Sequence, residues 1–261
     1  MNTRQKGIPR ENEPTEVSAG LIRLHKRIAN SGLCSRRTAE KFIAEGKVRV
    51  NGQIITQMGV MTSDDDEIRV QGRPLPSLKT TIIAMNKPRG YVTTMSDPRH
   101  SQTVATLLPS SVIGVKPVGR LDKDTEGLLL FTNDGELALR LTHPRFSVEK
   151  EYAVTVRGQI SEKSLEKLQK GVYIEGGRTD PAKIGGLYFR PGRDETAFHI
   201  TIHEGRNRQI RLMCQAIGNP VKTLKRVRIG PLSVRHLPRG QCRLLSQVEA
   251  EKLRKAVGLS S

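Results

Sequence analysis

The chain has 261 residues, of which 36% are apolar, so it can fold as one large domain or as one large and one small domain. Lys and Arg outnumber Asp and Glu by 44 to 26, and the formal net charge of +18 favours a polyanionic partner, either nucleic acid or an anionic membrane surface. No apolar run approaches the roughly 18 residues of a membrane-spanning helix. The three cysteines form no C-x-x-C pair, which argues against a zinc ribbon and a disulfide framework.

The first 20 residues lack the apolar core of a signal peptide, and their three glutamates argue against an organelle transit peptide. We interpret residues 1–20 as a disordered tail and the chain as a reduced, cytoplasmic protein.

Residues 21–75 are predicted to form a small α/β module of two helices and a hairpin. Ser35 is a candidate N-cap for the second helix, which should end near Gly46. Residues 47–55 indicate a hairpin, because its Asn51-Gly52 pair suits a two-residue turn with positive φ at both positions. The apolar residues of the first helix recur at helical spacing: Leu21, Leu24 and Ile28.

Basic side chains of this module are expected to point outward, and a solvated helix face is the default explanation for such a pattern. Like charges one helical turn apart repel slightly, which argues against a role in stability. The charge of the whole chain favours a nucleic-acid surface instead. The predicted binding set is Arg23, Lys26, Ser35, Arg36, Arg37, Lys41, Lys47, Arg49 and Asn51.

After a Pro-rich linker at 72–79, residues 81–261 are predicted to form a second domain. Strands are expected at 82–85, 128–132 and 151–157, and helices at 136–141, 207–217 and 246–257. The strand at 128–132 is apolar throughout and should be buried on both faces. Because there is no strict βαβ alternation and no phosphate-binding glycine loop, we expect the α+β class with a largely antiparallel sheet.

Residues 119–131 (GRLDKDTEGLLLF) place three carboxylates before that apolar strand, and they allow three interpretations. A calcium loop fits poorly, because its twelfth position is Asn133 where a bidentate glutamate is required. A solvated turn explains Asp124 and Glu126, which are expected on the loop surface. It explains Asp122 less well, since Asp122 and Arg120 share one side of an extended stretch and an arginine keeps a carboxylate ionised. An ionised carboxylate can act as a nucleophile or base.

A second candidate region begins at residues 204–211 (EGRNRQIR). Residues 204–239 contain nine Lys or Arg and one acid, which favours a phosphate-contacting surface over a salt-bridge surface of mixed sign. Ile210 on the predicted helix is most simply a core residue. Tyr152 should be buried on its strand, where core packing is the usual explanation and a stacking platform for a base is the functional alternative.

Together these segments resemble the signature of RNA pseudouridine synthases of the RsuA/RluB type, which modify ribosomal RNA. The resemblance rests on four motifs in the expected order, which are Asn86-Lys87-Pro88-x-Gly90, Gly119-Arg120-Leu121-Asp122, Lys150-Glu151-Tyr152 and residues 205–211 (GRNRQIR). Residues 22–70 resemble the RNA-binding module first seen in the fourth protein of the small ribosomal subunit.

The resemblance implies a fold and a set of residue roles. It implies a pseudouridine synthase domain with a central, mainly antiparallel sheet and an RNA cleft. Asp122 would be the catalytic aspartate and Arg211 its ion-pair partner. Tyr152 would stack on the flipped uracil, Ile210 would pack beneath the base, and Arg120 would help to place the loop. RNA contacts are expected from Lys87, Arg206, Asn207 and Arg208.

The expected function is isomerisation of uridine to pseudouridine in ribosomal RNA, with large-subunit (23S) RNA favoured over small-subunit (16S) RNA. The reaction changes no oxidation state and loses no group, so no metal or cofactor is expected. A non-catalytic ribosomal RNA binder or assembly factor is the alternative, and it would not need Asp122, Tyr152 and Arg211. A glycosidase fits poorly, because a chain of charge +18 is an unusual host for neutral glycans. We expect a monomer acting on ribosomal RNA or a pre-ribosomal particle, without DNA or membrane as partner.

Overall fold

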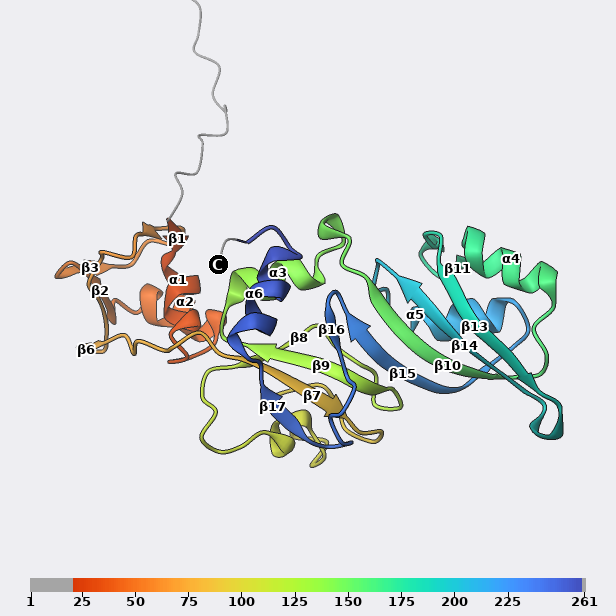
Figure 1. Cartoon of the computed structure of the whole chain (residues 1–261). Helices are drawn as coiled ribbons and strands as arrows, with labels where there is room; N and C mark the ends of the chain where they lie inside the picture. The colour runs from red at the N-terminus through yellow and green to blue at the C-terminus, as the bar shows by residue number, and fades with distance from the viewer. Residues whose placement is uncertain (1–20, 260–261) are drawn as a thin grey trace, which may run out of the picture. The chain divides into compact units, whose positions relative to one another are not determined.

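The computed structural model describes residues 21–259, and the chain divides between residues 77 and 78 into two compact units (Figure 1). The tail predicted at 1–20 lies outside the described residues. Within residues 21–259, no helix is long and apolar enough to cross a membrane.

The first unit contains two helices beside a small antiparallel sheet. The helices are α1 (Leu24–Asn30) and α2 (Arg36–Ala44). The sheet has the order β3-β2-β5-β6, and its strands are β2 (Val48–Val50), β3 (Gln53–Ile55), β5 (Ile68–Val70) and β6 (Arg73–Pro74). Two further short strands, β1 (Ile22–Arg23) and β4 (Met61–Thr62), pair with each other.

Local sequence signals correctly predict a helix cap and a turn in this unit. Ser35 caps α2 by accepting a hydrogen bond from the Thr38 amide at 3.1 Å. Asn51 and Gly52 have φ angles of 49° and 82°, which confirms the predicted hairpin turn. One prediction is wrong, because Leu21 precedes α1 and is exposed instead of joining the core.

The second unit contains a sheet of nine strands. Its main order is β13-β14-β10-β15-β9-β7-β17, while β8 pairs with β9 and β16 pairs with β15. The strands are β7 (Ile82–Lys87), β8 (Lys116–Val118), β9 (Glu126–Thr132), β10 (Lys150–Arg157), β13 (Lys183–Arg190), β14 (Glu195–Ile202), β15 (Val221–Ile229), β16 (Leu232–Ser233) and β17 (Cys242–Leu244). A separate hairpin joins β11 (Tyr173–Ile174) and β12 (Gly177–Arg178). Among the named strands of residues 21–259, β9 and β15 are the one parallel pair, which confirms the α+β class with a mainly antiparallel sheet.

Helices cover this sheet on both faces. The helices are α3 (Gly135–Thr142), α4 (Glu162–Lys170), α5 (Gln209–Ala216) and α6 (Gln247–Lys255), and short 3-10 turns lie at Val104–Leu107, Pro144–Phe146 and Pro191–Arg193. On β9, Leu129 and Phe131 join the core cluster that contains residues of α4 and α5, while Leu128 and Leu130 join the cluster that contains residues of α3 and α6. The prediction that this strand is buried on both faces is confirmed.

Helix α5 begins later than the sequence pattern predicts. Asn207 and Arg208 lie in the loop before the helix, and Arg208 adopts a left-handed backbone with φ of 50°. The charged groups of this motif are therefore presented by a loop at the entrance to the helix.

One row of cross-strand neighbours runs through the middle of the sheet. Lys87 on β7 pairs with Gly127 on β9, Gly127 pairs with Arg226 on β15, and Arg226 pairs with Tyr152 on β10. Only two residue pairs join β9 to β15, so this row includes half of the junction between the two parts of the sheet. At the junction a Cβ on residue 127 would lie 2.2 Å from the Arg226 carbonyl oxygen, and Gly127 has φ of +106°. A glycine is required there for both reasons.

We expect Gly127→Ala to lower the free energy of unfolding by about 3 kcal/mol or more, because the strain of positive φ adds to a backbone clash. Gly185→Ala on β13 is the matched control, since nothing lies within 4 Å of its added Cβ and its φ is not positive. Urea denaturation of the full chain measures both variants. Equal midpoints for the two variants would contradict the required close approach.

Candidate active site

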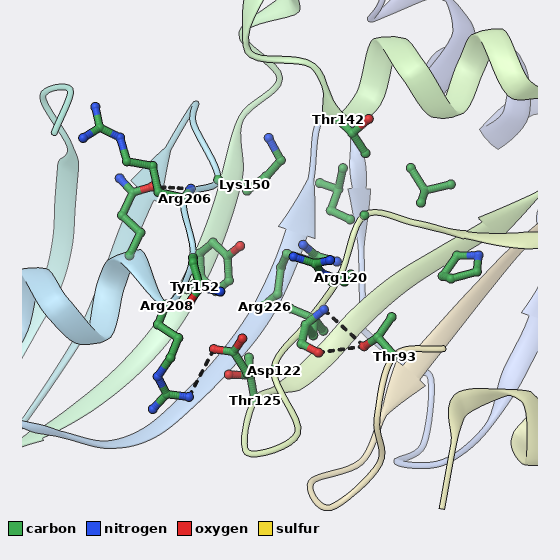
Figure 2. Close-up of a pocket in the computed structure, with 18 of the residues that line it drawn as sticks. Thr93, Arg120, Asp122, Thr125, Thr142, Lys150, Tyr152, Arg206, Arg208 and Arg226 are labelled. Carbon is green, nitrogen blue, oxygen red and sulfur yellow. Dashed lines mark hydrogen bonds and ion pairs between the residues drawn. The ribbon is translucent and has the colours of Figure 1, made fainter. Parts of the chain in front are cut away.

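A cavity of about 750 Å³ lies on the second unit beside the junction of β9 and β15 (Figure 2). Its wall comes from segments that are far apart in sequence, which are residues 93–95, the loop 116–125, the end of α3, strands β10, β14 and β15, and the loop 205–210. Ligand sites commonly have this size and this convergence of loops and strand ends.

Asp122 lines this cavity, and its side chain is 34% exposed. The nearest cation is Arg208, whose Nη1 lies 3.7 Å from Oδ2 of Asp122. At that separation the two groups attract electrostatically without a hydrogen bond. Among the described residues no donor is hydrogen-bonded to the Asp122 carboxylate, so its lone pairs face the cavity unengaged.

The loop that carries Asp122 is fixed through its backbone by a buried lysine. Lys87 is fully buried, and its Nζ donates to the carbonyl oxygens of Pro88, Asp122 and Thr125 at 3.2, 3.0 and 2.8 Å. Burial lowers the pKa of Lys87 to about 8, and the carboxylates of Asp122, Asp124 and Glu126 act in the opposite direction. The predicted role of Lys87 as an RNA contact is therefore wrong, because no surface of the side chain is available.

A threonine holds the loop from a second side. Thr93 donates its hydroxyl to the Leu121 carbonyl at 2.7 Å and accepts from the Leu121 amide at 3.2 Å (Figure 2). Leu121 is itself buried. The residue before Asp122 is thus fixed by both its backbone groups and its side chain.

Arg211 pairs with a different carboxylate from the one predicted. Its Nη2 lies 3.1 Å from Oδ2 of Asp124 and donates to the Asp124 carbonyl and to the Thr125 hydroxyl at 3.0 and 3.3 Å. Arg208 also reaches Asp124, at 3.4 Å. The predicted Arg211–Asp122 pair is wrong in this structure, and so is the placement of Asp124 as mere loop surface. The third acid, Glu126, forms an ion pair with Arg239 at 3.0 Å.

The apolar wall of the cavity contains Tyr152 and Ile210, which are 8% and 4% exposed. Both positions are core-like, as the sequence predicts. The Tyr152 hydroxyl has no hydrogen-bond partner within residues 21–259, whereas a tyrosine buried only for packing usually has one. Arg120 also lines the cavity and is exposed.

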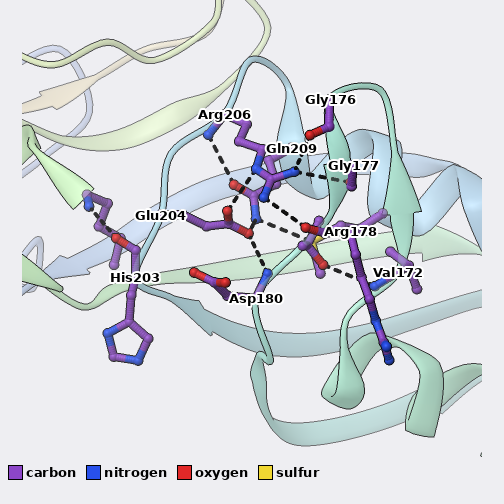
Figure 3. A network of polar contacts seen from close by, with 12 residues as sticks. Val172, Gly176, Gly177, Arg178, Asp180, His203, Glu204, Arg206 and Gln209 are labelled. Atoms are coloured by element: carbon purple, nitrogen blue, oxygen red, sulfur yellow. Dashed lines mark hydrogen bonds and ion pairs between the residues drawn. The ribbon is translucent and has the colours of Figure 1, made fainter. Parts of the chain in front are cut away.

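Arg206 belongs to a polar network behind the cavity wall (Figure 3). Its Nε donates to the buried carboxylate of Glu204 at 2.8 Å, and its two Nη groups donate to the carbonyls of Gly176, Gly177 and Arg178. Glu204 accepts further hydrogen bonds from the Asp180 amide and the Gln209 side chain. The guanidinium of Arg206 thus ties the loop before α5 to the β11–β12 hairpin. Arg206 also lines the cavity, and its predicted RNA contact stays a prediction.

Two cations of the cavity wall, one buried and one partly buried, were not assigned to the site from sequence. Arg226 is 4% exposed, although the basic run 204–239 predicts a phosphate-contacting surface there. Lys150 donates to the carbonyls of Val148 and His203, both at 3.2 Å. Burial lowers the pKa of Lys150 to about 8, and the charge of Arg226 lowers it further. No local pattern reveals this burial, because it depends on cross-strand pairing.

The predicted nucleic-acid set of the first unit is mostly on the surface. Arg23, Arg36 and Arg37 are exposed, and within the described part of the chain they form no ion pair. The remaining groups already have partners. Lys41 and Lys47 lie 3.8 and 2.6 Å from Glu45, Arg49 donates to the Gly52 carbonyl, and Asn51 bonds Asp66 and the Glu67 amide. Lys26 is half-buried, and the Ser35 hydroxyl serves as the α2 cap.

Within residues 21–259, no group of three or more His, Cys, Asp or Glu side chains is arranged to hold a metal ion.

We expect the stability of the wild-type chain relative to Lys150→Met to rise with pH. The pKa of Lys150 is about 8 in the folded chain against 10.5 for an ordinary lysine, so between these values the unfolded state binds more protons. The burial penalty is fully present below pH 8 and is relieved as pH rises towards 10.5. The gain from pH 7 to pH 9.5 should be about 1 kcal/mol once solvent screening is discounted. Urea denaturation at both pH values measures it, and a pH-independent difference would contradict it.

Comparison with known proteins agrees with the motifs and the fold. The model of the RNA pseudouridylate synthase family matches residues 81–216, and the S4 domain model matches residues 22–68. The chain is 40% identical to ribosomal large subunit pseudouridine synthase B of Bacillus subtilis (strain 168), over 89% of this chain and 95% of that protein. It is also 40% identical to the Pseudomonas aeruginosa protein of the same name, over 91% of this chain and 63% of that protein.

A crystal structure of a pseudouridylate synthase is similar along most of the chain. It has a TM-score of 0.64 and 34% sequence identity, and the match covers 89% of this chain and 99% of that one. The resemblance seen in the motifs is thereby confirmed. The chain belongs to the RNA pseudouridylate synthase family and carries an S4 domain at residues 22–68.

Proposed function

We propose that this chain isomerises a uridine of large-subunit ribosomal RNA to pseudouridine and that Asp122 is the essential catalytic group. One observation carries the proposal: an unengaged carboxylate on a rigid loop faces a cavity whose apolar wall holds Tyr152 and Ile210. The names of the similar proteins from Bacillus subtilis and Pseudomonas aeruginosa supply the class of RNA.

The bonds that break and form in the reaction determine which groups the site must contain. The bond between N1 of uracil and C1′ of the ribose breaks, the base turns, and a new bond joins C5 to C1′. The C5 proton leaves and N1 gains a proton, so the product is an isomer of the substrate. The site must therefore supply an ionised carboxylate, hold the detached base and keep it from diffusing away.

The two neighbouring acids of the loop are suited to different tasks. Asp124 is engaged by Arg208 and Arg211, whereas the Asp122 carboxylate has only a distant Arg208. Within the described residues the Asp122 carboxylate accepts no hydrogen bond, so its oxygens are free to contact the substrate. We assign the chemistry to Asp122 and the support of the loop to Asp124.

Tyr152 and Ile210 form a slot for the base. An aromatic ring on one wall and an aliphatic side chain on another favour a flat, uncharged ring over water. The unpartnered hydroxyl of Tyr152 is available to take up or relay the C5 proton. The uridine must leave its stack to reach the slot.

The RNA backbone is expected to meet exposed cations around the cavity. Arg120, Asn207 and Arg208 line the mouth and are exposed. In the first unit Arg36 and Arg37 present unpaired charge within the described residues. Phosphate contacts of this kind hold RNA without reading its sequence.

The first test is Asp122→Asn, which keeps the shape of the side chain and removes its charge. We expect pseudouridine formation to become undetectable, while RNA affinity changes by less than about threefold, because phosphate contacts supply most of the binding. Formation is measured by mapping pseudouridine in ribosomal RNA incubated with each variant. The same map with the wild-type protein identifies the target uridine and the subunit.

The matched control is Glu126→Gln, four residues along the same segment, whose carboxylate pairs with Arg239. This variant should keep substantial activity, and Asp124→Asn should fall between the two because it loosens Arg211. Wild-type product yield from Asp122→Asn would leave only a non-catalytic RNA-binding role.

A second test concerns the lysine beneath the loop. Lys87→Met keeps the length of the side chain and removes its three hydrogen bonds to loop carbonyls. We expect kcat to fall about 100-fold with RNA affinity nearly unchanged, since a shift of about 1 Å in a catalytic group has an effect of this size. Single-turnover assays and RNA titrations measure the two quantities. A lower melting temperature with unchanged kcat would restrict Lys87 to stability.

A further inference from the structure

Arg226 is a buried arginine whose donors are largely unused. It is 4% exposed, and its Nε donates to the Leu128 carbonyl at 2.8 Å. Within residues 21–259 the buried Nη2 has no acceptor. A guanidinium carries five N–H donors, and the contact of Nε with Leu128 is the one hydrogen bond that the Arg226 side chain makes among the described residues. Buried donors without acceptors are costly, and their presence calls for a functional explanation.

Within the described part of the chain, no carboxylate forms an ion pair with Arg226. Asp122 and Asp124, the acids of the adjoining loop, lie within ion-pair distance of Arg208 and not of Arg226. The other cation deep in the cavity wall, Lys150, also faces only carbonyl oxygens. This side of the cavity is therefore positive, and it suits a ligand that brings acceptor oxygens or negative charge.

The position of Arg226 in the sheet places its guanidinium beside the slot proposed for the base. Its cross-strand neighbour on one side is Tyr152, and on the other side Gly127 has no side chain to cover it. Arg226 lines the same cavity as Asp122 and Tyr152, and Figure 2 shows the three around one space.

The depth of Arg226 in the cavity favours a base over a phosphate as its partner. A phosphate stays on the hydrated RNA backbone, where the exposed Arg120 and Arg208 can meet it. The flipped base goes deepest, and uracil presents two carbonyl oxygens, O2 and O4. Breaking the bond from N1 to C1′ leaves the bonding electron pair on N1, and the negative charge spreads to both oxygens. A fixed cationic donor beside such an oxygen stabilises the charge as it develops.

We propose that Arg226 donates to a carbonyl oxygen of the flipped uracil and stabilises the negative charge on the base while it is detached from the sugar. This proposal rests on the proposed function and assigns a further catalytic residue to it. The charge returns to neutral when C5 joins C1′, the C5 proton leaves and N1 is protonated.

The test pairs enzyme variants with single-atom changes in the substrate. The substrates are RNA fragments that carry uridine, 2-thiouridine or 4-thiouridine at the mapped position, because sulfur accepts hydrogen bonds weakly. The enzymes are the full-length wild type, Arg226→Met and Arg226→Lys. Arg228→Met is the matched control, since Arg228 lies two residues along β15 and its guanidinium pairs with Glu149 and Glu151 outside the cavity.

We expect Arg226→Met to lower kcat on uridine RNA about 100-fold or more, the scale seen when one oxyanion-type donor is removed. With one of the two thio substrates, the wild type should react more slowly than it does with uridine RNA. Arg226→Met should react with that thio substrate at the same rate as with uridine RNA. Arg226→Lys should retain part of the wild-type rate. If Arg226→Met does not fold, the effect of sulfur on the rate is measured with Arg226→Lys, where it should be smaller than with the wild type. Arg228→Met should keep the wild-type rate and the wild-type response to sulfur.

Three results would overturn the inference. Equal slowing of wild type and variant by both thio substrates would mean that Arg226 contacts neither oxygen. A loss of RNA affinity with a flatter salt dependence would assign Arg226 to a phosphate. An unchanged kcat with lower stability would confine it to the Leu128 contact. Inactivity of the wild type on uridine RNA would instead refute the proposed function, which separates the two failures.

Discussion

The site depends on the close approach of two strands at Gly127 and Arg226. One part of the sheet, which includes β7 and β9, carries the aspartate loop and Lys87, and the other, which includes β10 and β15, carries Tyr152 and Arg226. Two residue pairs join them, and the absence of a side chain on residue 127 sets their separation. Because Lys87, Gly127, Arg226 and Tyr152 lie in one cross-strand row, a change in that separation would move the loop relative to the aromatic wall. The geometry of the cavity therefore depends on backbone contact at this junction as well as on side-chain packing.

The site has two regions that differ in charge balance. In the loop region, Arg208 and Arg211 are balanced by Asp122 and Asp124. Deeper in the cavity, Arg226 and Lys150 have backbone carbonyls as their only partners within the described residues. Carbonyl partners satisfy some donors without neutralising the charge, so the interior remains positive. Such an interior costs stability in the free protein and favours a ligand that becomes negative during the reaction.

Short-range sequence signals predicted much of the fold and only part of the site. The Ser35 cap, the Asn51-Gly52 turn and the apolar strand 128–132 follow from local rules, and the structure has all three. Motif resemblance placed Asp122, Tyr152 and Ile210 in one cavity. The partner of Arg211 and the burial of Lys87 and Arg226 were not predictable, because both depend on which strands become neighbours. A basic run in sequence does not distinguish a cation on the surface from one enclosed between β9 and β10.

The two neighbouring aspartates of the loop are held in different ways, and the difference is consistent with the role proposed for Asp122. Lys87 holds the loop through the backbone carbonyl of Asp122 and not through its carboxylate, so the position of the loop is fixed while the side chain is left free of that contact. A direct hydrogen bond from the buried ammonium would stabilise the ionised carboxylate and weaken it as a nucleophile or base. The opposite arrangement holds at Asp124, where Arg208 and Arg211 engage the carboxylate itself. Contacts with the loop backbone and with the Asp124 carboxylate thus hold the loop, and the Asp122 side chain remains directed at the cavity, as the proposed role requires.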